Sequence, residues 1–441
     1  MTSIEPLLPR SVELSARLHR MVPGGAHTYA KGDDQYPEDL APVISHGRGG
    51  HVWDVDGNEY IEYGSGLRSV SLGHAHPRVL QAARRELDRG ANFVRPSAVE
   101  VDAAQRFLET VPTAEMVKFA KNGSDVTTAA VRLARAVTNR PLVAICGNQP
   151  FFATDDWFIA TTPMSAGIPE PIAELTVSFP YGDLDATDEV LRRHHGQVAC
   201  LILEAATQHE PPPGYLAGLR ELADKHGCLL VFDEMITGFR WSEAGAQGLY
   251  GVVPDLSTFG KALGNGFAVS ALAGRREVME RGGLHHSRDR VFLLSTTHGA
   301  ETHSLAAAMA VLETYVAEGI TARLHALGER LAAGIRDAAT GMGVADHVVV
   351  RGRASNLVFV TLDEDGQPSQ AYRTLFLRQL IAGGVLAPSF VVSSALTEED
   401  IDRTVDVVAQ ACAVYRKALD AADPTVWMGG RAVKPVFRRF A

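Results

Sequence analysis

Two short stretches near the middle of the chain decide the fold: Cys228-Leu-Leu-Val-Phe-Asp233 and Asp255-Leu-Ser-Thr-Phe-Gly260-Lys261. The first is an apolar run that ends in a carboxylate, and the second is a Ser/Thr-containing run that ends in Gly-Lys. Short runs of this kind, bounded by polar residues and glycine, are typical of buried strands. We therefore predict two strands that each end in a residue able to carry chemistry.

The sequence on both sides of these stretches alternates between apolar runs and helical patterns. We predict further strands at 117–120, 142–146, 198–203 and 269–273, and helices at 77–89, 127–137, 215–225 and 300–338. Strands that alternate with helices form a mostly parallel sheet with helices on both faces. The central part of the chain is therefore predicted to be a large α/β domain.

The two ends of the chain have a different pattern. They contain a helical pattern at 12–21, a hairpin at 52–61, strands at 348–352 and 357–362, and helices at 372–382 and 398–420. We predict a fold of the α/β class, with a large domain at 76–329 and a smaller α+β domain formed by 1–75 and 330–441.

The composition is ordinary for a globular protein with a sizeable core. Of 441 residues, 46% are hydrophobic and 21% are charged, and the net charge is -10. The sequence has no block of Lys and Arg of the kind that follows a phosphodiester backbone, so we expect no nucleic-acid partner.

The cysteines and the N-terminal residues bear on the compartment. Cys146, Cys200, Cys228 and Cys412 form no Cys-x-x-Cys pair, which favours buried free thiols in a reducing environment. Residues 1–6 lack a signal-peptide pattern, and no apolar stretch is long enough to cross a bilayer. We expect a cytoplasmic protein with no membrane partner.

Asp233 and Lys261 together indicate a cofactor. Ligands of parallel α/β sheets collect at the carboxyl ends of the strands, where both residues are predicted to lie. Pyridoxal 5'-phosphate (PLP) needs a lysine for its Schiff base and an acid for its pyridinium nitrogen. Taken singly, Asp233 is read as a helix cap and Lys261 as a solvated lysine, and only their joint placement favours PLP. The metal-site alternative finds no support, because no Cys or carboxylate cluster joins His74 and His76.

A phosphate seat is predicted at Lys121-Asn-Gly-Ser-Asp125, which leads directly into a helix. Free N–H groups at a helix start, with Gly123 and the Ser124 hydroxyl, suit a phosphate. The plain alternative is a helix cap formed by Ser124 or Asp125. Two phosphate motifs are excluded: a Walker A loop, because Asp255 stands where it has its first glycine, and a dinucleotide fingerprint, because Val269 replaces its third glycine.

These residues resemble the class III aminotransferases, which are fold type I PLP enzymes. The resemblance runs from Pro23 to about residue 412, and the sequence is similar to the branch of glutamate-1-semialdehyde aminomutases. The stretches that carry it are 55–60, 72–77, 121–124, 132–135, 232–240 and 259–264.

The resemblance implies a homodimer with active sites shared between the subunits, and roles for individual residues. Lys261 would be the Schiff-base lysine and Asp233 the pyridinium partner. Gly123 and Ser124 would hold the phosphate, and Thr297 would reach the phosphate across the dimer.

The resemblance also places two residues around the ring. Met235 would pack on one face. Glu204 lies where family members have an acid near the phenolic oxygen and the substrate, although a strand-end acid in water is an equal alternative.

Two departures from the family pattern matter. The Tyr-His-Gly stretch whose aromatic ring stacks on the cofactor is replaced by residues 146–152, so Gln149 or a phenylalanine must cover the ring. The Phe-Glu-Ala stretch of the aminomutases is missing after Ala387-Pro-Ser389, which argues against the aminomutase reaction.

Three further segments, 27–37, 155–158 and 433–439, look like class III enzymes that aminate sugar carbonyls in aminoglycoside antibiotic pathways. We therefore expect transfer of an amino group from L-glutamate to a small-molecule carbonyl acceptor, the 6'-aldehyde of an oxidised aminoglycoside. Arg68 and Arg240 are candidates for binding the donor carboxylates, with surface or interdomain ion pairs as the alternative. Other hypotheses are an aminomutase, a PLP-dependent racemase or epimerase, and a non-catalytic PLP-fold binding protein.

Overall fold

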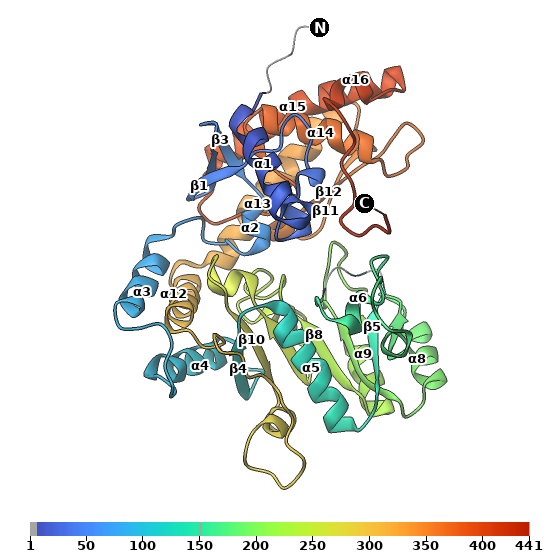
Figure 1. The fold of residues 1–441 in the computed structure, drawn as a ribbon. Helices are drawn as coiled ribbons and strands as arrows, with labels where there is room; N and C mark the ends of the chain where they lie inside the picture. The colour runs from blue at the N-terminus through green and yellow to red at the C-terminus, as the bar shows by residue number, and fades with distance from the viewer. Residues whose placement is uncertain (1–6, 148, 150–151, 441) are drawn as a thin grey trace. The chain divides into compact units, whose positions relative to one another are not determined.

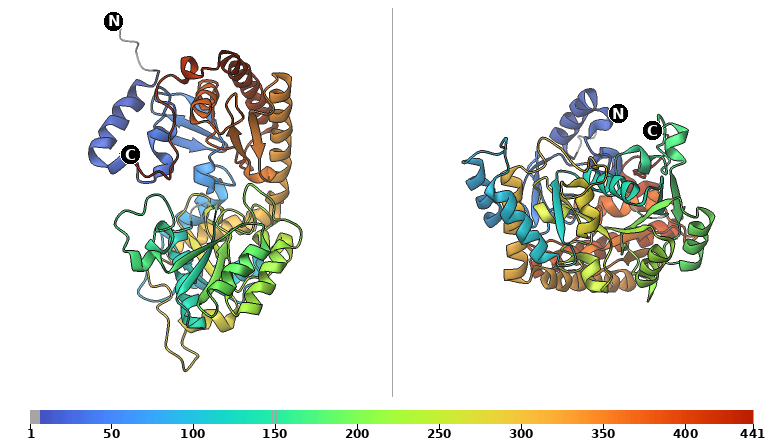
Figure 2. Two further views of the ribbon diagram at one scale, coloured as in Figure 1. Left: turned by 90° about the vertical axis from the view of Figure 1, so that its right-hand side faces the viewer. Right: turned by 90° about the horizontal axis from the view of Figure 1, so that it is seen from below.

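The computed structural model describes residues 7–147, 149 and 152–440. The chain forms two compact units (Figures 1 and 2). The smaller unit contains the residues up to 66, residues 71–76 and residues 322 onward, and the larger unit contains residues 67–70 and 77–321.

The larger unit is built on a seven-stranded sheet in the order β4-β10-β9-β8-β7-β5-β6. The strands are β4 (Met116–Ala120), β5 (Leu142–Cys146), β6 (Thr176–Phe179), β7 (Val198–Leu203), β8 (Leu229–Asp233), β9 (Leu256–Phe259) and β10 (Ser270–Gly274). Strand β10 is antiparallel to both of its neighbours, and the pairs from β6 to β9 are all parallel. The predicted mostly parallel sheet is confirmed, and β5 and β7 have the predicted bounds.

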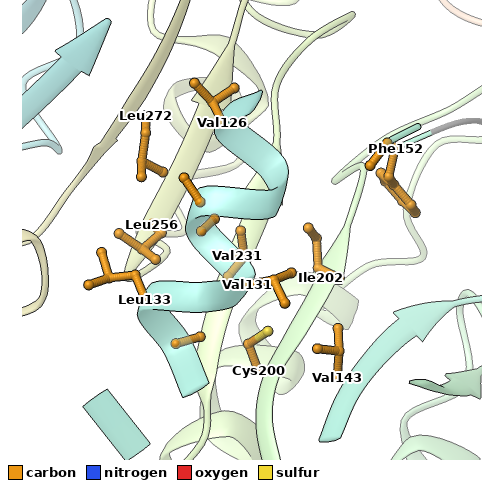
Figure 3. Close-up of a cluster of buried hydrophobic side chains, with 14 of the residues drawn as sticks. Val126, Val131, Leu133, Val143, Phe152, Cys200, Ile202, Val231, Leu256 and Leu272 are labelled. Carbon is orange, nitrogen blue, oxygen red and sulfur yellow. The ribbon is translucent and has the colours of Figure 1, made fainter. Parts of the chain in front are cut away.

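Apolar runs form these strands because both faces of the sheet are covered, as parallel sheets require. Alternate residues of β5 belong to two different buried clusters. Val143 and Ile145 belong to the first cluster. Leu142, Ala144 and Cys146 belong to the second. Figure 3 shows the first cluster, in which α5 (Gly123–Thr138) lies along the strands.

The other helices of the larger unit connect the strands or pack beside them. They are α3 (Pro77–Leu87), α4 (Ala98–Thr110), α6 (Asp156–Ile159), α7 (Glu170–Ala173), α8 (Leu184–Arg193), α9 (Tyr215–His226), α10 (Gly245–Tyr250), α11 (Arg276–Met279) and α12 (Thr302–Glu318). The short strand β6 and helices α4 and α8 were not among the elements predicted from the sequence.

The smaller unit contains a four-stranded sheet in the order β1-β2-β3-β13 and a separate antiparallel pair. Its strands are β1 (Ile44–Arg48), β2 (His51–Asp54), β3 (Glu59–Glu62), β11 (Val348–Arg351), β12 (Val358–Thr361) and β13 (Val385–Leu386). Its helices include α1 (Pro9–Met21), α14 (Gln370–Ala382), α15 (Glu398–Ala421) and α16 (Thr425–Met428), with most of α13 (Ile320–Gly341). The predicted hairpin at 52–61 is confirmed by the antiparallel pairing of β2 with β3.

The structure also bears on the predictions for the cysteines and for membrane-spanning segments. The four cysteines are free and buried, as predicted. Within the part of the chain that the structure describes, no single helix meets the length and hydropathy criteria for a bilayer span, although α12 and α13, bent by 71°, meet them as a pair.

Candidate active site

Asp233 is the last residue of β8, and its carboxylate is buried with one oxygen unused. Its Oδ1 accepts hydrogen bonds from the Met235 backbone N–H at 2.9 Å and from the Thr258 hydroxyl at 3.1 Å. Its Oδ2 is buried and has no hydrogen-bond partner among the described residues. Burial raises the pKa of Asp233, and the charge of Lys261 opposes that rise. A buried acceptor without a partner is costly, and at the end of a strand close to Lys261 this oxygen is available to a ligand.

Lys261 follows β9 and lies close enough to Asp233 for each charge to affect the other. Its φ of 46° is in the left-handed region, which non-glycine residues seldom adopt and which is found at sites that store backbone strain. Burial lowers the pKa of Lys261, while the charges of Asp233 and Glu204 raise it. A lysine with a lowered pKa is deprotonated more readily, which makes it a better nucleophile and base.

Glu204 follows β7 and brings a second carboxyl group to the same cluster. Its side chain is buried, and burial, with the charge of Asp233, raises its pKa to about 8. The charges of Lys261 and Arg68 oppose this rise. The structure therefore joins Asp233, Lys261, Glu204 and Arg68 in one electrostatic group at the carboxyl ends of β7, β8 and β9.

The start of α5 lies at the end of β4 and presents backbone N–H groups that have no acceptor within the helix. Gly123 and Ser124 are its first two residues. Asp125 turns back to accept the N–H of Asn122 at 2.9 Å, and the Ser124 hydroxyl accepts the N–H of Thr154 at 3.0 Å. The helix start is thus held in place by Asp125 and the loop after β5, which suits an anion-binding site.

Met235 packs between two glycines of this cluster. A Cβ added to Gly123 would lie 3.2 Å from the Met235 sulfur, and one added to Gly260 would lie 2.7 Å from it. A side chain at position 260 would therefore require the Met235 side chain to move. The side chain connects the phosphate seat predicted from sequence with the backbone that precedes Lys261.

Comparison with known proteins decides the family. A family model described as aminotransferase class-III matches residues 33–408. The chain belongs to the class III aminotransferases. A glutamate-1-semialdehyde 2,1-aminomutase of Syntrophobacter fumaroxidans is 32% identical over 419 residues, covering 89% of this chain and 94% of that protein.

Solved structures agree with this assignment. An omega-transaminase from Sphaerobacter thermophilus matches with a TM-score of 0.84 and 25% identity, covering 95% of this chain and 98% of that one. A transaminase with PLP bound matches with a TM-score of 0.84 and 26% identity, covering 94% and 98%. The predicted family, the fold type I architecture and the PLP-dependent class of enzyme are confirmed.

The residues of this class III aminotransferase fit PLP. The cofactor carries a phosphate, a protonated ring nitrogen and an aldehyde carbon, which call for an anion site, a buried acid and a lysine respectively. The unused Oδ2 of Asp233, the helix start at Gly123 and the lysine with a lowered pKa provide one of each.

Two hydrogen bonds to the backbone of Glu204 hold the side-chain amide of Gln149. Its Nε2 donates to the carbonyl of Glu204 at 2.7 Å, and its Oε1 accepts the N–H of Glu204 at 2.9 Å. Both bonds lie along the edge of the amide, so they fix its plane. Phe152 instead packs against Phe158 in the buried core, at 5.4 Å between ring centroids. Phe151, the other phenylalanine of the stretch, is outside the described residues.

Thr297 is exposed and lies in the segment between α11 and α12. The Asn92 side chain donates to its carbonyl at 3.0 Å. A few residues further on, Glu301 forms an ion pair with Lys121, two residues before the first residue of α5. This pair connects the Thr297 loop to the phosphate seat of the same chain.

The two arginines predicted to bind substrate have different environments. Arg68 is partly exposed, and its charge affects Glu204 and Lys261. Arg240 is fully buried, and its guanidinium group donates to the backbone carbonyls of Arg68 and Ile236. The charges of both arginines lower the pKa of Lys261, but only Arg68 also acts on Glu204, while Arg240 is buried against the Arg68 backbone.

Glu234 was not singled out from the sequence. Its carboxylate is fully buried and accepts the N–H groups of Ala246 at 2.8 Å and Gln247 at 2.9 Å, together with the Thr237 hydroxyl. Glu234 follows the last residue of β8, and the two carboxylates have different partners: that of Asp233 bonds to Met235 and Thr258, and that of Glu234 to the start of α10. Two consecutive acids at a strand end were a signal that the second one has a partner in the core.

Proposed function

We propose that this class III enzyme transfers the amino group of L-glutamate to the carbonyl of an oxidised sugar, the 6'-aldehyde of an aminoglycoside. The observation that carries the reaction type is the buried group of Asp233, Lys261 and Glu204, in which Asp233 retains an unused oxygen. Arg68, beside this group, supports a carboxylate-bearing donor.

The bound PLP supplies a ring that accepts electrons from the substrate carbon that loses its proton. Asp233 would hold a proton on the ring nitrogen through Oδ2. Lys261 would hold the cofactor and, once released by the amino donor, would use Nζ to take the proton from the donor α-carbon and to return it elsewhere. The lowered pKa of Lys261 favours the neutral amine that this step requires.

The other proposed contacts position the cofactor. Gly123 and Ser124 would bind the phosphate through the start of α5, and Thr297 of a second copy would complete that site in a homodimer. The exposure of the Thr297 loop supports this assignment. Met235 would cover one face of the ring and the fixed amide plane of Gln149 the other.

Glu204 would remain protonated over part of the working pH range, because its pKa is raised to about 8. In that form it donates a hydrogen bond and leaves the charge of Arg68 for the donor carboxylate. Its place beside Lys261 suits contact with the cofactor oxygen or with the substrate.

The sugar acceptor is supported by the distinctive segments at the two ends of the chain. In the smaller unit, segments 27–37 and 433–439 contact each other: the Lys434 N–H donates to the Asp34 carbonyl at 3.0 Å, and Arg438 pairs with the Asp34 carboxylate at 2.6 Å. The two segments that look like those of sugar-aminating enzymes thus form one structural feature.

An aminomutase is the second candidate, because the Syntrophobacter relative carries that name. The two reactions differ in their products: an aminotransferase releases a keto acid from the donor alone, whereas an aminomutase keeps the nitrogen on one carbon skeleton. The missing glutamate after Ala387-Pro-Ser389 favours the aminotransferase.

The experiment is a half-reaction. The yellow holoenzyme is mixed with L-glutamate alone, and loss of colour and release of 2-oxoglutarate are measured, with Lys261→Ala as the matched control. We expect one 2-oxoglutarate per active site from the wild type and none from the variant. Oxidised aminoglycosides are then tested as acceptors. Absence of 2-oxoglutarate, together with turnover of glutamate-1-semialdehyde, would overturn the proposal in favour of the aminomutase.

A further inference from the structure

The backbone before Arg68 makes an unusual left-handed turn, α2 (Ser65–Arg68). The φ angles of Ser65, Gly66, Leu67 and Arg68 are 45°, 56°, 59° and 69°. For residues other than glycine this conformation costs about 1–2 kcal/mol each, so a run of it persists only where the surroundings hold it.

Arg240 holds the end of this turn. Its guanidinium group donates to the Arg68 carbonyl and, at 3.4 Å, to the Ile236 carbonyl four residues before it. The side chain is fully buried, and burial lowers its pKa to about 10. Phe239, the residue before Arg240, also has a left-handed backbone, with a φ of 66°. Two strained backbone segments therefore meet at one buried guanidinium group.

The left-handed turn ends at Arg68, whose side chain acts on the active-site cluster. Its charge opposes the rise in the pKa of Glu204 and lowers that of Lys261, so it lies beside the reacting group. Arg240 is connected to Asp233 along the chain, because Asp233 is the last residue of β8 and Arg240 lies in the loop that follows it. The end of β8 thus provides the acid of the cofactor site, and the loop after it provides the support for Arg68.

We propose that Arg240 is a positioning residue: by holding the Arg68 carbonyl it fixes the left-handed turn and orients the Arg68 guanidinium group to bind a substrate carboxylate. This inference rests on the proposed carboxylate-bearing substrate. Arg240 does not touch that substrate. Its effect comes from pre-organisation, because a bidentate arginine that is already oriented loses less entropy when it binds.

The test measures binding rather than turnover. Glutarate, a dicarboxylate without an amino group, is titrated into PLP-loaded holoenzyme by calorimetry, and the PLP dissociation constant of each variant is measured separately. The variants are Arg68→Met, Arg240→Lys and Arg240→Met. Arg220→Met is the matched control, because Arg220 is a partly buried arginine that pairs with Asp255 at the start of β9, the opposite end of that strand from Lys261.

We expect Arg240→Met to weaken glutarate binding by about tenfold, the equivalent of one lost hydrogen bond to a charged donor. Arg240→Lys should fall between the wild type and Arg240→Met, because an ammonium group can still donate to one carbonyl. Arg68→Met should weaken binding at least as much as Arg240→Met. All three variants should bind PLP like the wild type, and Arg220→Met should match the wild type in both measurements.

Three results would overturn the inference. The first two are glutarate binding by Arg240→Met within twofold of the wild type, and unchanged glutarate binding by Arg68→Met. The third is a loss of PLP affinity in the Arg240 variants as large as their loss of glutarate affinity. Failure of the wild type to bind glutarate would overturn it as well. Glutarate binding without release of 2-oxoglutarate from glutamate would leave the positioning role supported and would reject only the proposed donor.

Discussion

Replacement of Glu234 by alanine tests how the loop after β8 is held. The carboxylate is fully buried, and it accepts hydrogen bonds from the backbone N–H groups of Ala246 and Gln247 at the start of α10. Gly245 is required beside it, because a Cβ there would lie 2.5 Å from a Glu234 oxygen. Removal of the carboxylate leaves both N–H groups in a space with no acceptor.

The expected loss of stability follows from these contacts. A buried donor left unsatisfied costs about 1–3 kcal/mol, so two cost about 2–6 kcal/mol. The Thr237 hydroxyl can rotate to another acceptor and adds less. Burial raises the pKa of Glu234, so removal of the carboxylate also relieves a desolvation penalty, and the loss should lie toward the lower half of that range. Glu234→Gln keeps one acceptor oxygen and should lose about 1–3 kcal/mol.

The assay is native-state hydrogen exchange of the apoenzyme, followed at the amides of Ala246 and Gln247. The free energy of opening at these amides should fall by the amounts given for Glu234→Ala and Glu234→Gln. Glu243→Ala is the matched control, because Glu243 is a partly exposed acid in the same loop and its loss should change stability by less than about 0.5 kcal/mol. An opening free energy for Glu234→Ala within about 1 kcal/mol of the wild type would refute the argument.

Three further outcomes are expected. Gly260→Ala should weaken PLP binding more than Gly123→Ala, measured by equilibrium titration, because its Cβ would lie closer to the Met235 sulfur (2.7 Å against 3.2 Å); an equal effect would contradict this packing. Asp233→Asn should retain the fold by circular dichroism but lose at least about a thousandfold in kcat, because a neutral amide does not hold the ring proton. The pKa of Glu204 is raised from 4.5 to about 8. Between these two values the folded state keeps a proton that the unfolded chain releases. The contribution of Glu204 to stability therefore falls as the pH rises from the lower value to the higher. The melting temperature of Glu204→Gln apoenzyme, relative to the wild type, should therefore rise between about pH 5 and pH 9, and a flat difference would show that Glu204 is not the group that titrates.

The sequence by itself determined the strands that carry the chemistry. β5 and β7 are continuous apolar runs because both faces of a parallel sheet are buried, so their bounds can be read directly from composition. Asp233 and Lys261 were predicted because each ends such a run, and the carboxyl ends of parallel strands meet at one edge. The family was recognisable for the same reason, since its motifs lie at those strand ends.

Only the tertiary structure decided which atoms meet. Arg68 and Arg240 have the same side chain, yet Arg68 acts on Glu204 whereas Arg240 is fully buried and donates to the Arg68 backbone carbonyl. The acceptor role of Glu234 depends on two N–H groups more than ten residues away, and the amide plane of Gln149 depends on the backbone of Glu204. Periodicity assigns a side chain to a face of its own strand or helix. It does not specify the non-local partners, which are fixed when distant segments pack and their buried polar groups must find one another.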